Sequence, residues 1–91
     1  MSNVIYKYSL FLADSQTLEI PKGSEILKVD CQNNNLVMWA CVDPEQETEE
    51  RTFAIIGTGR PFDPSNLKYI DTVQQHNGIL IWHIYEEMYN G

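Results

Sequence analysis

A glycine-rich loop with one arginine, Gly57-Thr58-Gly59-Arg60, follows the apolar run FAII and precedes Pro61. Backbone N–H groups beside glycines can form an anion-binding nest, and a guanidinium can bond a phosphate through two N–H groups. The pattern therefore predicts a binding loop for a small phosphorylated, nucleotide-like ligand. Phosphate-binding loops of the Walker and dinucleotide types open a helix, however, and no helical pattern follows here. The alternative is a turn in which Gly57 and Gly59 supply unusual φ angles.

A run of acidic residues lies in the segment DPEQETEE, which we expect to form a long polar turn. It contains Asp43, Glu45, Glu47, Glu49 and Glu50. This charge could dock on a basic surface of a protein partner, with an association that weakens as salt rises. The alternative is a solvated loop, because charge runs usually lie in solvent. The spacing does not resemble a Ca²⁺ loop, which needs a glycine at its bend.

Residues for catalysis or metal binding form no recognisable pattern. His83 lies in the run IWHIY without a signature that supplies a nucleophile or a carboxylate partner. We expect it to be a structural histidine that bonds Thr72 across a hairpin. Cys31 and Cys41 belong to neither a CxxC motif nor a His/Cys cluster, so we predict neither a metal site nor a cofactor. We therefore predict that the protein is not an enzyme.

The chain of 91 residues carries a net charge of −7, with six basic side chains scattered along it. Direct binding of nucleic acid needs clustered Lys and Arg, so we do not expect it. No apolar run reaches the roughly 20 residues of a membrane helix. The first residues also lack the basic and apolar regions of a signal peptide. We therefore expect a cytoplasmic protein without membrane contact.

Turn residues separate short runs with the alternating apolar pattern of strands along the whole chain. The sequence predicts an all-β fold: a single domain over residues 1–91, with about seven mostly antiparallel strands in a barrel or sandwich. At most one short helical turn is expected, at Asp63. Asn77-Gly78 predicts a tight hairpin, and the two-sided apolar run LVMWACV predicts a central strand. Trp39 and Trp82 lie on the two most apolar strands, so both are expected in the core.

In the run EILKVDC, the alternation places Leu27, Val29 and Cys31 on one face. A turn at residues 32–35 would put Cys41 roughly 16 Å along the partner strand from Cys31. A disulfide needs Cα atoms within about 7 Å, so we expect both thiols to be free. A short chain with apolar faces and free strand edges also predicts a homo-oligomer, with a dimer as the first expectation.

Four segments cover most of the chain: YKYSL, IPKGSEILKVDCQNNNLVMWACVDPE, ERTFAIIGTGRPF and YIDTVQQHNGILIWHIYEE. Together they resemble a family of small proteins of unknown function that bacteriophages and prophages encode. The resemblance implies a phage origin and a place in the host cytosol, but it implies no reaction. Small acidic phage proteins of one domain often bind a host protein or sequester a host signal, which is an argument from class.

The leading interpretation is a non-enzymatic, phage-type binding protein that acts on a host or phage factor, which could include interference with host defence. The alternative is a protein that sequesters a nucleotide-like ligand through Gly57–Arg60. A virion accessory protein is a further alternative. The first interpretation needs an exposed acidic segment, and the second needs Arg60 to face an open pocket.

Overall fold

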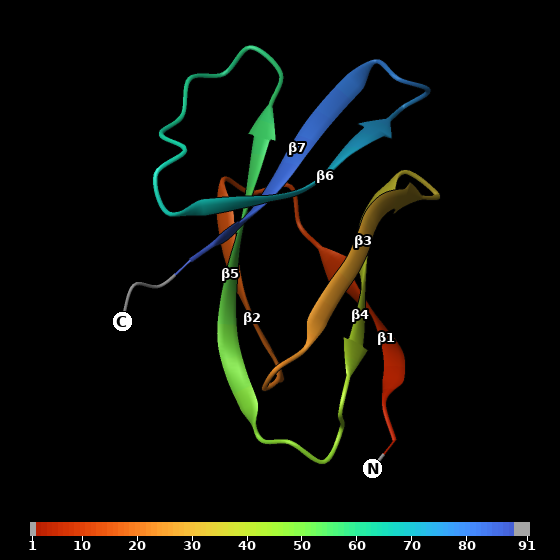
Figure 1. The fold of residues 1–91 in the computed structure, drawn as a ribbon. Helices are drawn as coiled ribbons and strands as arrows, with labels where there is room; N and C mark the ends of the chain where they lie inside the picture. The colour runs from red at the N-terminus through yellow and green to blue at the C-terminus, as the bar shows by residue number, and fades with distance from the viewer. Residues whose placement is uncertain (1, 89–91) are drawn as a thin grey trace.

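Two β-sheets pack face to face in the computed structural model, which describes residues 2–88 (Figure 1). The strands are β1 (Val4–Leu10), β2 (Ser15–Pro21), β3 (Glu25–Gln32), β4 (Asn35–Val42), β5 (Thr48–Gly57), β6 (Leu67–Gln75) and β7 (Leu80–Glu87). Sheet A has the order β1-β4-β3, and sheet B has the order β2-β5-β7-β6. All neighbouring strands are antiparallel. The predicted all-β domain of seven strands is confirmed, as a sandwich and not a closed barrel.

Residues 2–88 contain no helix, and thus no helix long and apolar enough to cross a membrane. The helical turn expected at Asp63 is instead a tight turn closed by the Leu67 N–H and the Pro64 carbonyl, 3.1 Å apart. Asn66 has a φ of 61° there, which a right-handed helix does not allow. The Asp63 carboxylate accepts the Ser65 N–H at 2.9 Å, and bonds from Ser65 lower the pKa of Asp63.

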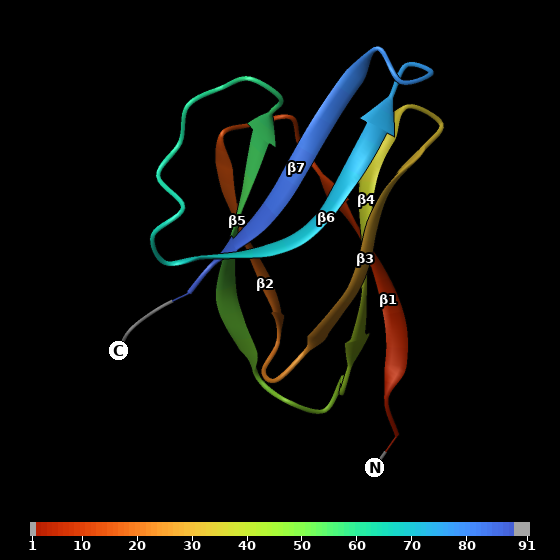
Figure 2. The same cartoon turned by 45° about the horizontal axis from the view of Figure 1, so that its top comes forward.

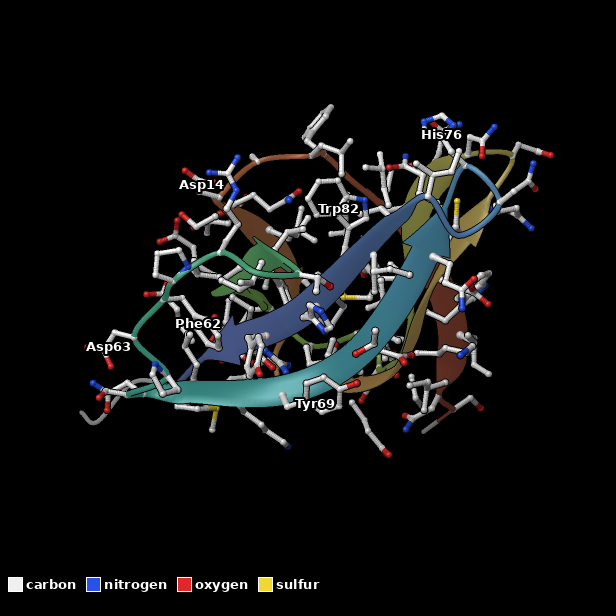
Figure 3. All side chains as sticks on the ribbon, turned by 90° about the horizontal axis from the view of Figure 1, so that it is seen from above. Asp14, Phe62, Asp63, Tyr69, His76 and Trp82 are labelled. Atoms are coloured by element: carbon white, nitrogen blue, oxygen red, sulfur yellow. The ribbon has the colours of Figure 1, made fainter. Side chains whose placement is uncertain are left out.

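The connection between β5 and β6 crosses sheet B, because β7 lies between these two strands. The loop of residues 58–66 therefore has to return from one end of the sheet to the other. Phe62 in this loop packs on Tyr85 of β7, with ring centroids 5.3 Å apart, and lies beside β7 in Figure 3. Tyr85 alternates with the buried Ile84, so it points to the outer face, the face turned away from sheet A.

The core lies between the sheets and takes side chains from both. It contains Leu10, Val29, Leu36, Met38, Phe53, Ile55, Val73 and Ile84, with Trp82 packed against it. Trp39 alternates with Met38, lies opposite Lys7 and Lys28, and occupies the outer face of sheet A. The expected core position of Trp39 is therefore wrong. Strand β4 is central, as predicted, but only one of its faces meets the other sheet.

A β-bulge changes the faces predicted for β3. The register against β4 shifts just after Ile26. Ile26 and Val29 therefore both face the core, whereas Leu27 is 45% exposed. The alternation placed Leu27 on the same face as Val29, and this prediction is wrong because a bulge inserts one unpaired residue.

Two tight hairpins confirm the turn predictions. The Ile79 N–H donates to the His76 carbonyl at 3.2 Å, around Asn77-Gly78. Asn77 and Gly78 have φ angles of 56° and 85°, the left-handed values that such hairpins need. The β3–β4 turn has the same form, with φ angles of 53° at Asn33 and 63° at Asn34.

The strand registers that these turns set also agree with the registers predicted from the sequence. Thr72 lies opposite His83, and Cys31 lies opposite Leu36. Cys41 lies at the other end of β4, opposite Glu25. Both cysteines are free, as predicted.

Gln75 joins the tips of the two hairpins, which lie side by side in Figure 2. Gln75 is 5% exposed. Its side-chain carbonyl accepts the Trp82 Nε1–H at 2.9 Å, and its side-chain NH₂ donates to the Asn34 carbonyl at 2.7 Å. Asp71 makes a second tie between the sheets, since its carboxylate accepts the Val29 N–H at 3.2 Å. Both ties lie on the side of the sandwich where β3 packs against β6.

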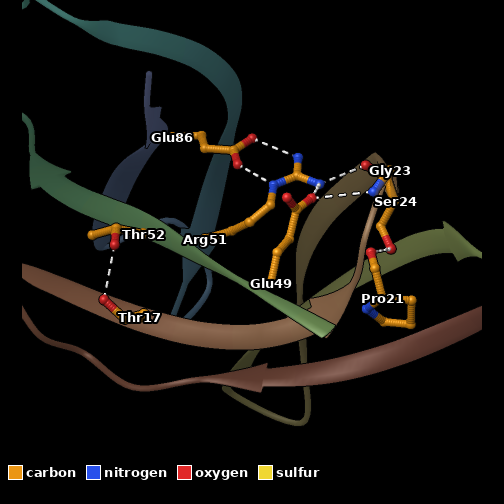
Figure 4. Close-up of polar contacts among 8 residues, drawn as sticks. All are labelled: Thr17, Pro21, Gly23, Ser24, Glu49, Arg51, Thr52 and Glu86. Carbon is orange, nitrogen blue, oxygen red and sulfur yellow. Dashed lines mark hydrogen bonds and ion pairs between the residues drawn. The ribbon is translucent and has the colours of Figure 1, made fainter. Parts of the chain in front are cut away.

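Arg51 of β5 and Glu86 of β7 form an ion pair at one end of the core (Figure 4). The guanidinium donates to both carboxylate oxygens of Glu86 and, through Nη1, to the Ser24 carbonyl at 2.6 Å. Glu86 is 8% exposed. The hydrogen bond to Glu86 is the main reason that the pKa of Arg51 is raised. Because Ser24 lies in the turn from β2 to β3, the pair fastens sheet B to the chain that enters sheet A.

We expect Glu86→Gln to lower the free energy of unfolding by about 3 kcal/mol, because it removes the carboxylate that bonds a largely buried guanidinium and leaves, within residues 2–88, only Glu49, 3.9 Å away. Urea unfolding followed by circular dichroism measures this loss. Glu87→Gln, at an exposed neighbouring position, is the matched control and should change stability by less than about 0.5 kcal/mol. Equal midpoints for the two variants would contradict a stabilising role of the pair.

Candidate functional site

An open hollow of about 700 Å³ lies beside the loop Gly57–Arg60. It is lined by Leu12, Ala13, Asp14, Ile55, Ile56, Gly57, Arg60, Pro61 and Trp82. The β1–β2 loop forms one part of its wall, and the end of β5 with Trp82 of β7 forms the other. This size lies within the range of about 300–1,000 Å³ that is typical of small-molecule sites.

The loop Gly57–Arg60 is a hydrogen-bonded turn. The Arg60 N–H donates to the Gly57 carbonyl at 3.1 Å, and the Thr58 N–H donates to the Ile81 carbonyl at 3.3 Å. Gly59 has a φ of 87°, which only glycine adopts readily at this position of a type II turn. The Thr58 and Arg60 amides therefore already have partners, and the backbone at this point forms the hydrogen-bonded turn that was the alternative interpretation. The Arg60 side chain is the one charged group of this loop that could bind an anion.

Gly57 is needed for space and not for its φ angle, which is not positive. A Cβ atom at this position would lie 3.3 Å from Trp82 Cζ3 and 3.5 Å from Arg60 Cγ. The glycine therefore lets the indole ring and the arginine stem approach the same stretch of backbone. Trp82 Nε1 bonds Gln75, so the opposite edge of the indole faces Gly57.

Two unpaired charges of opposite sign line the hollow. Within residues 2–88, the Arg60 guanidinium has neither an ion pair nor a side-chain hydrogen bond. The Asp14 carboxylate is likewise free in this range, while the Asp14 carbonyl accepts the Ile55 N–H at 3.2 Å. Figure 3 shows Asp14 and Trp82 along one side of the view and Tyr69 along the other. The hollow thus combines a cation, a hydrogen-bond acceptor and an indole wall.

Of the four residues of the predicted loop site, Gly57 and Arg60 line the hollow, but Gly59 does not, and neither does Thr58. Its Oγ1 lies 2.7 Å from His83 Nε2, on the outer face of sheet B. His83 Nδ1 lies 3.1 Å from Thr72 Oγ1, which is 2.6 Å from the Tyr69 hydroxyl. Both imidazole nitrogens therefore have partners, and the predicted Thr72–His83 bond is confirmed. The sequence did not indicate the bond to Thr58, which anchors the loop to the sheet.

The acidic run is divided between structural and exposed side chains. The Asp43 carboxylate accepts the Glu45 N–H at 3.1 Å and shapes the turn. Glu49 belongs to β5 and not to the expected turn, and its carboxylate accepts the Gly23 N–H at 3.1 Å. It also lies 3.9 Å from Arg51 Nη1. Asp43 and Glu49 therefore serve the fold, which the sequence did not reveal.

The remaining acidic residues of the run, Glu45, Glu47 and Glu50, are exposed. Glu50 also lies on β5, where the sequence predicted a turn. It is directly opposite Glu19 of β2. Like charges in directly opposite positions repel each other. We call Glu45, Glu47 and Glu50, together with Glu19, the acidic patch.

Among the described residues, no group of three or more His, Cys, Asp or Glu side chains is arranged to hold a metal ion.

An aromatic cluster lies on the outer face of sheet B, where the ring centroids of Tyr69 and Tyr85 are 5.5 Å apart and Phe62 packs on Tyr85. Phe62 is 42% exposed and Tyr69 is 52% exposed. Burial is the main reason that the pKa of Tyr8, on β1, is raised.

The sequence profile of a family described as "Domain of unknown function (DUF7352)" matches residues 1–90, so the chain belongs to this family. No curated protein and no solved structure matches the chain. The description of this family names no activity.

We expect Gly57→Ala to displace the Trp82 indole, because the added Cβ would lie 3.3 Å from its ring. Overpacking of this kind lowers the free energy of unfolding by about 1–3 kcal/mol. In a Trp39→Phe background, where Trp82 is the one tryptophan, the fluorescence maximum should shift.

Gly59→Ala is the control, since a Cβ there has no atom within 4 Å and the strain is confined to the backbone. It should destabilise the turn but leave the Trp82 emission unchanged. Equal emission shifts for the two variants would show that Gly57 has no special contact with the indole.

Proposed function

We propose that this member of the DUF7352 family binds a small anionic ligand with a flat, partly apolar body, of the nucleotide type. The binding site is the hollow beside Gly57–Arg60. The observation that supports this proposal is the Arg60 side chain, which lines a pocket-sized hollow and forms no ion pair within residues 2–88.

Each part of the hollow has a role in such binding. The guanidinium can donate two parallel hydrogen bonds to a phosphate. The indole of Trp82 and the apolar walls can cover the flat part of the ligand. The Asp14 carboxylate can accept bonds from amino or hydroxyl groups. A bare phosphate would use only Arg60, and a neutral apolar ligand would leave both charges unused. A nucleotide-like molecule uses all three parts.

The proposed role is sequestration of the ligand and not its conversion. His83 bonds two threonine hydroxyls, so it has no free nitrogen to act as a base on a ligand. The proposed setting, which follows from the resemblance of the sequence to phage and prophage proteins, is a host cytosol in which a host or phage signal is removed. The resemblance supports this setting, and the geometry of the hollow supports the ligand class.

A second candidate function is docking of a basic protein partner on the acidic patch. The opposed Glu19 and Glu50 side chains support it, because a cationic group between them would relieve their repulsion. Glu45 and Glu47 extend the patch along the β4–β5 loop. This candidate corresponds to a host-factor binding protein, and it needs no pocket.

For ligand binding, we expect at least one nucleotide in a panel to raise the melting temperature, since a ligand at a hundred times its dissociation constant adds roughly 2.7 kcal/mol. Arg60→Ala should then weaken affinity by tenfold to over a hundredfold, the equivalent of roughly 1.5–3 kcal/mol for a charged hydrogen bond. Lys22→Ala removes an exposed cation outside the hollow and should leave affinity unchanged. Absence of any shift, or equal losses in both variants, would overturn the proposal.

For the acidic patch, we expect the triple change of Glu45, Glu47 and Glu50 to Gln to slow association with a decalysine peptide. The difference from the parent should shrink as salt rises, because exposed charges are screened beyond about 8 Å at physiological ionic strength. Stopped-flow kinetics at several salt concentrations measures this. Nucleotide affinity should not change in this variant, so the two candidate functions are tested separately.

A further inference from the structure

Three of the four edge strands carry features that hinder pairing with another strand. On β3, the Asp71 carboxylate occupies the Val29 N–H, beside the bulge. On β2, the strand ends at Pro21, which has no N–H to donate to another strand. On β6, the register shifts between Tyr69 and Asp71. Each edge is interrupted, by a bulge, a covering side chain or a proline.

The fourth edge strand, β1, has no such feature. It pairs with β4 over all seven of its residues without a register shift. Within residues 2–88, no hydrogen bond reaches its backbone from any element other than β4. Alternate N–H and C=O groups of an antiparallel edge strand point away from its neighbour, so this edge is open for pairing.

The side chains of β1 also fit an interface. Val4, Ile5 and Tyr6 are 39%, 62% and 42% exposed. Tyr6 packs edge-on against Tyr8 with ring centroids 6.3 Å apart. The strand contains no carboxylate, whereas β2, β3 and β6 contain Glu or Asp. In a chain of net charge −7, β1 is therefore the edge at which two copies repel each other least.

We propose that β1 pairs antiparallel with β1 of a second copy of this chain and joins the two A sheets into one continuous sheet. The pairing is isologous, so a single strand supplies both halves of the interface. The register with Tyr6 opposite Tyr6 of the partner subunit pairs two aromatic rings and places Ile5 opposite Lys7 of the partner subunit. A register centred on Lys7 would oppose two like charges. The hollow contains no residue of β1, so this inference is independent of the proposed ligand.

Sedimentation equilibrium at about 10 and about 100 μM protein tests the proposal, since it resolves micromolar dissociation constants. The parent should form dimers. Ile5→Lys, at a side chain that is 62% exposed, should raise the dissociation constant at least tenfold, because it places like charges together across the pair. Ile79→Lys makes the same change at a side chain that is 80% exposed in the β6–β7 turn, and it should dimerise like the parent.

Amide hydrogen exchange gives a second readout. Peptides that contain residues 4–10 of the parent should become more protected as protein concentration rises, whereas those of Ile5→Lys should not. A monomeric parent at both concentrations would overturn the proposal. So would equal weakening by the two lysine variants, or protection that rises at another strand edge and not at β1.

Discussion

The ion pair between Arg51 and Glu86 is the interaction on which the arrangement of the two sheets depends. A chain of 91 residues buries only roughly 60–65% of the surface that it exposes when unfolded, so packing alone gives a modest margin of stability. A largely buried ion pair stabilises a fold only when the remaining hydrogen bonds of both groups are satisfied. Here the guanidinium bonds both Glu86 oxygens and the Ser24 carbonyl, so the pair meets that condition. It thereby holds the turn through which the chain leaves sheet B for sheet A.

The other polar ties between the sheets lie on one side of the sandwich. Asp71 bonds the backbone of β3, and Gln75 bonds Asn34 at the hairpin tips, both where β3 packs against β6. The edge strands on the opposite side are β1 and β2. The β1–β2 loop there forms a wall of the hollow, and β1 keeps its edge open. These two ties add to the ion pair in holding the sheets together, and the hollow and the open β1 edge lie on the side that lacks them.

Local chemistry was sufficient to predict the strands and the hairpin registers. Asn77-Gly78 demands a left-handed turn, and that turn alone places Thr72 opposite His83. The bulge after Ile26 and the outer position of Trp39 could not be predicted, because alternation reports neither an inserted residue nor which face a second sheet covers. The hollow shows the same limit: Arg60 was found from its loop, whereas Asp14 and Trp82 reach it from distant segments. Likewise, the structural role of Glu49 could not be predicted, because the nearby exposed residues Glu47 and Glu50 have the same side chain. Only the folded chain places the Glu49 carboxylate where it accepts the Gly23 N–H.

The net charge of −7 affects what the hollow can select. An approaching anion is repelled by the net charge of the chain and attracted by Arg60, and salt screens both interactions over about the same length. A bare phosphate gains one charge-assisted contact and suffers the full repulsion. A ligand with a flat apolar body also gains the burial of that surface against Trp82 and the apolar walls, roughly 25 cal/mol for each Å² removed from water. This gain does not depend on net charge. Under the proposed function, both kinds of anion would be repelled by the acidic surface and would bond the same guanidinium, so the burial of the flat body is what would favour nucleotide-like molecules over small inorganic anions.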